Sequence, residues 1–245
     1  MLRNATNCDS TAGFQRRWNV ELGARARRGF SLTVTGTALL TGLFFIGYFY
    51  VMRHPAHIPT LMPRTQLDLM IPFQPQALPA YVSLWIYIGF GPGLQRTYAA
   101  LSVYALWMIG LCVSGLVIFY FWPTQVPPLT VDAAGHNGGF AMLRRIDEAG
   151  NACPSMHVAV AIFTAVRVDE VLRSTGAPRL LRLLNGAWFL LIAYSTLAIK
   201  QHVVLDVAAG ALLGLIFVLP SLRWRPRESD GACVLWHHAT GSEPR

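Results

Sequence analysis

The sequence predicts an all-α, polytopic membrane protein built as a bundle of six transmembrane helices. Of its 245 residues, 53% are hydrophobic and 13% are charged, and the mean hydropathy is +0.41. This composition is too apolar for an ordinary soluble domain of the same length. Several apolar stretches also reach the roughly 20 residues that a helix needs to cross a hydrocarbon core. The lipid bilayer is therefore the expected solvent.

Six spans are expected at about residues 30–51, 78–94, 98–122, 154–172, 183–199 and 202–222. The first follows an Arg-rich leader without a small-residue cleavage site, so it is predicted to be an uncleaved anchor. The fourth is the least typical, because its purely apolar part ends before Arg167, Asp169 and Glu170. Such a short run is also compatible with a helix buried inside the protein.

The distribution of positive charge predicts the orientation. With six spans, 15 of the 20 Lys and Arg residues fall on the side of the two chain ends. The positive-inside rule then places both termini in the cytoplasm. The expected organisation is a cytoplasmic leader (1–29), a six-helix membrane phosphatase domain (30–222) and a cytoplasmic tail (223–245).

The formal net charge of +8 is accounted for by this topological bias and by attraction to anionic membrane lipids. No basic stripe with interleaved aromatic residues indicates nucleic-acid binding, so no nucleic-acid partner is expected. The four cysteines have no metal-type spacing and are spread over different environments, which argues against a disulfide framework.

His202 and Asp206 are the first chemical feature, because residues four apart lie one turn from each other on a helix. A carboxylate that bonds one ring nitrogen fixes the tautomer and leaves the other nitrogen free to attack phosphorus. It also stabilises the cation that forms. His202 is therefore the candidate nucleophile and Asp206 its orienting partner.

His157 begins the fourth span and His202 begins the sixth, two crossings later. The six-span topology alone therefore places both histidines at the outer face, where His157 could protonate a leaving oxygen. Pro154 favours a helix start there, and the free N–H groups of a helix N-terminus favour an anion. Further candidate donors to phosphate are Ser155, Lys200, Arg144 and Arg145.

Two other interpretations of these residues stay open. A histidine within a membrane span is costly and usually marks a site, but His202 and Asp206 could form a satisfied packing pair. Two histidines and one carboxylate could also bind a metal. Asp206 is better placed to orient His202 than to share a metal, so no metal and no other cofactor is expected. Lys200 and the two arginines could individually be interface anchors.

Three segments carry a likeness to a known family. They are Asn151–His157, Ser195–Asp206 and, less specifically, Ile71–Phe73 with Tyr81–Ser83. The chain resembles the type 2 phosphatidic acid phosphatase superfamily, especially the branch with inositol phosphorylceramide synthases.

The resemblance implies a six-helix bundle and metal-independent phosphate chemistry through a phosphohistidine. It also implies that His202 is the nucleophile, Asp206 its partner and His157 the general acid. Ser155, Asn151 and Ser195 then become candidate substrate-binding residues.

Two departures from the family pattern concern the phosphate-binding cations. The family's first motif usually has a Lys and then Arg-Pro, whereas the matching loop, Pro123–Pro128, has no basic residue. In the third motif, Thr196 stands where an Arg usually follows the Ser. Lys200, Arg144 or Arg145 are the expected substitutes.

The expected function is hydrolysis of a lipid phosphate or diphosphate. The runner-up is transfer of a phospho-headgroup to a lipid hydroxyl, which shares the first covalent step. A lipid-binding or transport protein with a vestigial site is the alternative from another class. The residues do not specify the lipid, nor the oligomeric state.

Overall fold

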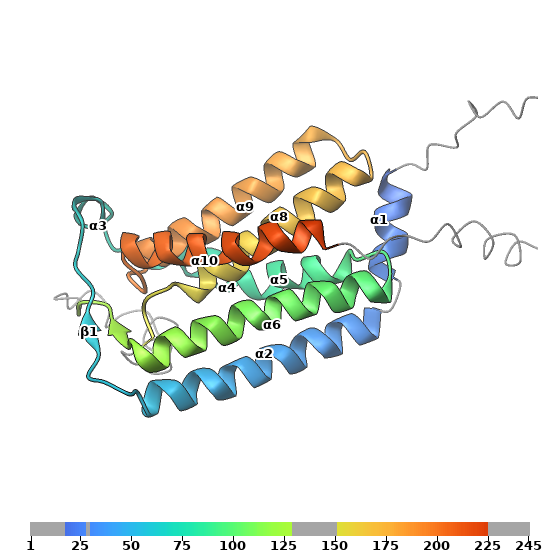
Figure 1. Cartoon of the computed structure of the whole chain (residues 1–245). Helices are drawn as coiled ribbons and strands as arrows, with labels where there is room; N and C mark the ends of the chain where they lie inside the picture. Colours follow the sequence, from blue (N-terminus) through green and yellow to red (C-terminus); the bar gives the residue numbers. More distant parts are fainter. Residues whose placement is uncertain (1–17, 28–29, 129–150, 225–245) are drawn as a thin grey trace, which may run out of the picture.

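The structure is a computed structural model that describes residues 18–27, 30–128 and 151–224. Helices account for nearly all of the regular structure. Most of the long ones slant in a similar direction, whereas the short helix nearest the N-terminus lies across them (Figure 1). The long helices are α2 (Phe30–Arg53), α6 (Tyr98–Phe121), α8 (Met156–Ser174), α9 (Arg179–Ala198) and α10 (Val204–Arg223). The shorter ones are α1 (Trp18–Arg27), α3 (Gln66–Met70), α4 (Leu78–Val82), α5 (Leu84–Gly93) and the 3-10 helix Pro75–Ala77.

Each of the six expected spans coincides with helix, but only four helices have the length and hydropathy of a membrane span by themselves. Within the described ranges these are α2, α6, α9 and α10. The stretch 78–94 is divided at Ser83 into the short helices α4 and α5. Helix α8 has four charged residues in its C-terminal half, Arg167, Asp169, Glu170 and Arg173. The structure is thus a helical membrane protein with four candidate spans.

The interior position of α8 in the bundle accounts for its charged residues. It packs against α5, α6, α9 and α10, and more than half of its residues are buried, including Arg167. Helix α2 lies at the periphery, where no residue of its most apolar stretch is buried (Figure 1). The short apolar run of the fourth expected span therefore belongs to an interior helix, as one of the two sequence-based interpretations predicted.

Close approach of α10 to α8 depends on glycine. A Cβ atom on Gly210 would collide with the carbonyl oxygen of Ser155, and one on Gly214 would collide with Ile162. At the same level the N–H of Ser155 donates to the carbonyl oxygen of Asp206, with 2.9 Å between the atoms. These contacts fix the beginning of α8 against the first turn of α10.

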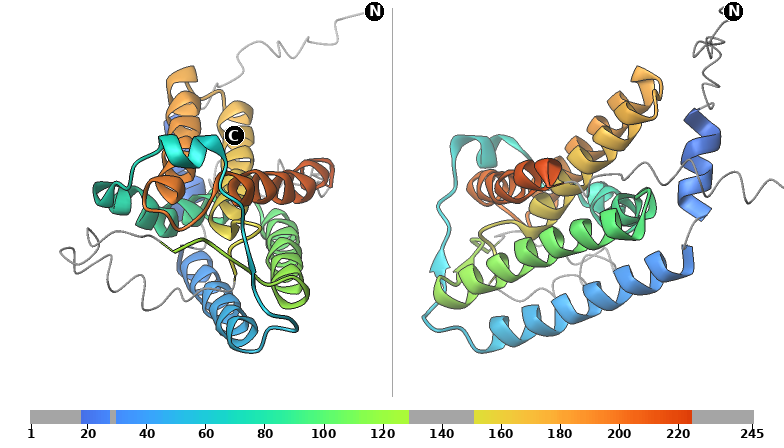
Figure 2. Two further views of the ribbon diagram at one scale, coloured as in Figure 1. Left: turned by 90° about the vertical axis from the view of Figure 1, so that its left-hand side faces the viewer. Right: turned by 45° about the vertical axis from the view of Figure 1, so that its right-hand side comes forward.

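The end of the bundle where α8 and α10 begin is covered by irregular segments. Strands β1 (Thr60–Leu61) and β2 (Thr124–Gln125) form a two-stranded parallel sheet there. The chain between α2 and α4 runs across this end and carries α3, as Figures 1 and 2 show. Its buried Met62 packs in a small cluster with Ala152, Cys153 and Val203. We call this end the site end.

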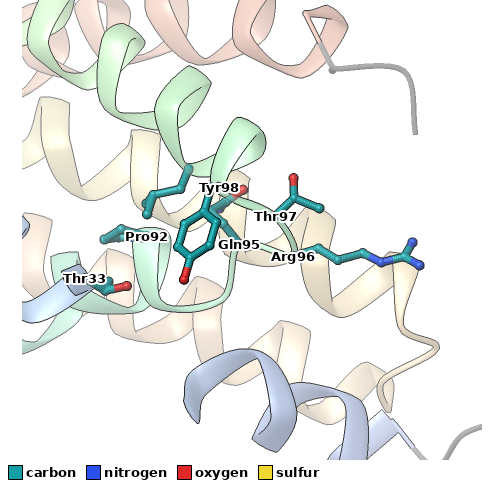
Figure 3. A pocket seen from close by; sticks show the side chains of 7 residues that line it. Thr33, Pro92, Gln95, Arg96, Thr97 and Tyr98 are labelled. Carbon is teal, nitrogen blue, oxygen red and sulfur yellow. The ribbon is translucent and has the colours of Figure 1, made fainter. Parts of the chain in front are cut away.

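The opposite end of the bundle holds a second set of buried polar groups. Arg167 donates to Gln95 Oε1 at 3.1 Å and to the carbonyl oxygen of Ser221 at 3.3 Å. Nearby, the turn between α5 and α6 forms the small pocket of Figure 3, lined by Thr33, Pro92, Gln95, Arg96, Thr97, Tyr98 and Leu101. That pocket contains none of the residues expected to bind substrate.

Candidate active site

His202 is placed by the tight loop between α9 and α10. The carbonyl oxygen of Thr196 accepts the backbone N–H groups of Gln201 and His202, at 3.1 and 3.2 Å. Lys200 adopts a left-handed backbone conformation with φ of 58°, which reverses the chain direction within a few residues. The side chain of His202 is almost fully buried as a result.

His202 and Asp206 meet as the spacing predicts, although His202 lies just before α10 and not on it. Helix α10 begins at Val204 because Asp206, at its third position, accepts the N–H of Val203 at 2.9 Å. The same oxygen, Oδ2, lies 3.5 Å from His202 Nδ1. This distance is long for a hydrogen bond, and such contacts commonly shorten when substrate binds. Asp206 is completely buried.

His157 lies on the first turn of α8, and its ring centre is 6.1 Å from that of His202. The expectation that both histidines share one end of the bundle is confirmed. Tyr81 of α4 stacks on His157 with 4.2 Å between ring centres, and its hydroxyl lies 3.4 Å from His157 Nδ1. His157 Nε2 is buried without a hydrogen-bond partner in the described part of the chain.

Tyr81 was not among the residues expected to form the site. Its only signal in the sequence was its position in the Tyr81–Ser83 segment of the family likeness. The hydroxyl can bond one ring nitrogen of His157 and so set which nitrogen faces the substrate. Trp85, one turn further along, meets the same ring edge-on at 5.9 Å.

The helix N-terminus expected at Pro154–His157 is present, but the helix begins two residues later than predicted, at Met156. Ser155 is the N-cap of α8, and its hydroxyl accepts the N–H of Val158 at 3.4 Å. Pro154 therefore precedes the cap and does not occupy the first helical turn as predicted. Ser155 is completely buried and touches α10 through its backbone. It thus lies between the two histidine-bearing segments.

Two other expected substrate-binding residues direct their donor groups elsewhere. Asn151 donates from Nδ2 to the carbonyl oxygen of Tyr48 in α2 at 3.1 Å. Ser195 donates to the carbonyl oxygen of Ile192 in its own helix at 2.6 Å. The Asn151 amide thus connects its segment to α2, whereas the Ser195 hydroxyl bonds within α9.

Lys200 also has protein partners for its charge. Its ammonium group donates to the carbonyl oxygen of Asp68 at 2.8 Å and to that of Ile71. Burial lowers the pKa of Lys200, and the positive charge of Arg64 acts in the same direction, while Asp68 opposes it. The other expected cations, Arg144 and Arg145, lie outside the described residues.

Cys153 lies beside the site but does not supply its nucleophile. Burial and the neighbouring Asp206 carboxylate raise the pKa of Cys153 to about 11, so the thiol stays protonated at neutral pH. Among the described residues, no group of three or more His, Cys, Asp or Glu side chains has the arrangement of a metal site. His157 and His202 are the candidate reactive groups that the geometry brings together.

Fold and site together define a helical membrane protein with a buried two-histidine centre at one end of its bundle. Residues 76–219, more than half of the chain, match the family model of the PAP2 superfamily. The chain belongs to this superfamily, whose members are generally phosphatases or related enzymes. Comparison with curated proteins and with solved structures found no match.

Proposed function

We propose that the protein is an integral membrane phosphatase that hydrolyses a lipid phosphate or diphosphate through a phosphohistidine intermediate. The observation that carries the proposal is the meeting of His157, His202 and Asp206, which come from α8, from the loop before α10 and from α10, and are separated by as many as 49 positions in the sequence. Membership of the PAP2 superfamily supports phosphatase-type chemistry.

In the first step of the proposed reaction, the lone pair of His202 Nε2 forms a bond to phosphorus. The bond between phosphorus and the leaving oxygen breaks, and His157 transfers a proton to that oxygen. The leaving group is a lipid alcohol or, from a diphosphate, a lipid monophosphate. Asp206, 3.5 Å from Nδ1, stabilises the positive charge that His202 acquires.

In the second step, water attacks the phosphohistidine and the N–P bond breaks. His157, now neutral, accepts a proton from that water, and the product is inorganic phosphate. His157 therefore donates the proton of the first step and accepts the proton of the second, and its Nδ1 faces Tyr81. With a phosphodiester substrate the lipid alcohol would leave and the phosphohistidine would keep the headgroup. Attack by a lipid hydroxyl in place of water would then break the N–P bond and transfer the phospho-headgroup, the reaction expected of a synthase.

The same proposal includes a topology. Six membrane crossings, with α4 and α5 forming one and the interior helix α8 another, place both chain ends in the cytoplasm and the site at the outer face. The 15 basic residues on the side of the chain ends support this orientation. Cysteine-accessibility labelling of a residue in the segment between α2 and α4 would test it, because labelling from the cytoplasmic side would reverse the assignment.

The decisive experiment measures release of inorganic phosphate from a panel of lipid phosphates by the purified protein and by His202→Ala. We expect activity to fall by at least about 10³-fold in the variant, because it lacks the group that forms the proposed covalent intermediate. Equal phosphate release by both proteins would remove His202 as nucleophile. Appearance of headgroup on an added lipid acceptor without free phosphate would identify a transferase.

A further inference from the structure

The segment between α2 and α4 lies mostly outside the family match, yet it is bound to the site. The match begins at residue 76, whereas β1 and α3 precede it. Asp68 of α3 is buried, and its Oδ1 accepts the backbone N–H of Val204, the first residue of α10, at 2.8 Å. Together with the bonds from Lys200 to the carbonyl groups of Asp68 and Ile71, this contact fixes the segment next to His202.

Arg64 is held in this segment by contacts on both sides. Met62, two residues earlier, packs with Cys153 and Val203, the neighbours of the two catalytic segments. Thr65, the next residue, caps α3 through reciprocal bonds with Asp68. The Nη2 atom of Arg64 donates to the carbonyl oxygens of Pro127 and Pro128, at 3.2 and 3.0 Å. The guanidinium group is therefore anchored at the site end.

Arg64 forms no ion pair with a carboxylate among the described residues, and its hydrogen-bond partners are neutral carbonyl groups. Lys200 already uses its ammonium group to donate to the carbonyl oxygens of Asp68 and Ile71. The side chain of Arg64 is exposed, and in the part of the chain that the structure describes only its Nη2 atom donates a hydrogen bond. Such a guanidinium can bind two phosphate oxygens at once.

The loop that anchors Arg64 is also the loop without a cation of its own. Residues 123–128 occupy the place of the family motif that usually carries Lys and Arg, and none of them is basic. Arg64 reaches this loop from a different segment, 63 residues earlier in the chain. Its positive charge also acts on Lys200, which is two residues from the proposed nucleophile.

We propose that Arg64 binds the phosphate group of the substrate, supplying from the α2–α4 segment the cation that the 123–128 loop lacks. The inference rests on the proposed function for the identity of the ligand as a phosphate monoester or diphosphate. Arg64 forms no covalent bond in the reaction. It neutralises charge on the phosphate oxygens and orients them while His202 attacks.

The test measures binding of inorganic phosphate in detergent solution in a His202→Ala background, so that it does not depend on turnover. Arg64→Gln keeps a donor for the Pro127 and Pro128 carbonyl groups but removes the charge, and we expect it to raise the Kd for phosphate about 10-fold or more. The Kd of Arg64→Lys for phosphate should lie between that of the parent protein and that of Arg64→Gln. Arg53→Gln, which changes an exposed arginine at the end of α2, is the matched control and should leave the Kd unchanged.

Equal phosphate affinity with and without the Arg64 guanidinium would overturn the inference, and so would a parent protein that binds no phosphate. Failure of the proposed reaction has a different signature. If His202→Ala releases phosphate from lipids as fast as the natural chain, the nucleophile is wrong, while the phosphate Kd of Arg64→Gln still decides the role of Arg64.

Discussion

The two ends of α8 bury polar groups in opposite ways. Near its C-terminal end, Arg167 donates to Gln95 and Ser221 and lies 3.8 Å from the carboxylate of Glu170. Near its N-terminal end, His157 uses Nδ1 towards Tyr81, while its Nε2 is buried without a partner among the described residues. One helix thus carries at one end a guanidinium group with several polar partners, of which only Nε has no hydrogen bond among the described residues. At the other end it carries an imidazole of which one of the two ring nitrogens has none.

The difference distinguishes buried polar groups that stabilise the fold from buried polar groups that take part in a reaction. A buried charge with several partners lowers its own desolvation cost and fixes the helices around it. A buried ring nitrogen without a partner costs free energy, and such groups concentrate where a substrate completes the hydrogen bonds. On this comparison, substitutions at the site end should affect the reaction, and those at the opposite end should affect folding.

The largest expected effect at the site end, after loss of His202, is that of His157→Gln. We expect kcat for a lipid phosphate to fall by about 10²- to 10⁴-fold, because the leaving alkoxide no longer receives a proton. The loss should be much smaller for an aryl phosphate, whose leaving group needs no proton. Melting temperature should change little, since Nε2 has no hydrogen bond to lose among the described residues.

Steady-state kinetics with both substrates and a thermal melt check this prediction. His54→Gln is the matched control, because His54 is exposed just after α2 at the same end of the bundle. An equal loss of activity on lipid and aryl phosphates would contradict a role of His157 as the acid.

At the opposite end, Arg167→Met should reduce stability instead of chemistry. Removing the guanidinium leaves Glu170, Gln95 Oε1 and the Ser221 carbonyl without this donor, and we expect a loss of about 3 kcal/mol in the free energy of unfolding. Below the lowered melting temperature, kcat should match that of the natural chain. Thermal melts in detergent and activity at several temperatures measure the two quantities.

Arg182→Met provides the comparison for Arg167, because Arg182 forms a two-bond ion pair with Asp169 that is partly open to the surroundings. Its loss should lower the melting temperature less than the loss of Arg167, since exposed pairs contribute little. A strong loss of kcat in Arg167→Met at low temperature would mean that the two ends of α8 are coupled.

A smaller effect than that of Arg167→Met should come from Gly210→Ala, which acts on the contact between the site-bearing helices. The added methyl group would collide with the Ser155 carbonyl oxygen, and we expect a loss of about 2 kcal/mol in stability together with reduced activity. Gly186→Ala in α9 is the control, since its methyl group would enter open space and should stabilise the helix by up to about 1 kcal/mol. Unchanged activity in Gly210→Ala would show that this contact does not position the site.

Hydropathy and residue spacing sufficed to predict several features of the protein. Long apolar runs gave the positions of α2, α6 and α10 to within a few residues, because burial in lipid is a local property of the chain. The shared end of His157 and His202 followed from counting crossings. A separation of four residues predicted the pairing of His202 with Asp206. The pair does form, but His202 lies in the loop before α10, so this loop and not a helical turn brings the two side chains together.

Other features required contacts that no local pattern contains. Only packing shows that α8 is interior, that Lys200 is bonded to carbonyl groups of a distant segment, and that Tyr81 stacks on His157. The capping pattern Thr65 to Asp68 indicates a helix start, but nothing local indicates that Asp68 also accepts the N–H of Val204.

The sequence by itself therefore determined the apolar helices, the candidate histidines and their common end of the bundle, since each depends on composition or short spacing. Only the tertiary structure decided that Arg64 lies at the site end. Arg64 is 63 residues from the carbonyl groups that hold it, and its place depends on how β1, α3 and the loop after α6 pack together. No periodic pattern in the sequence predicts where a single exposed side chain lies relative to residues far away in the chain.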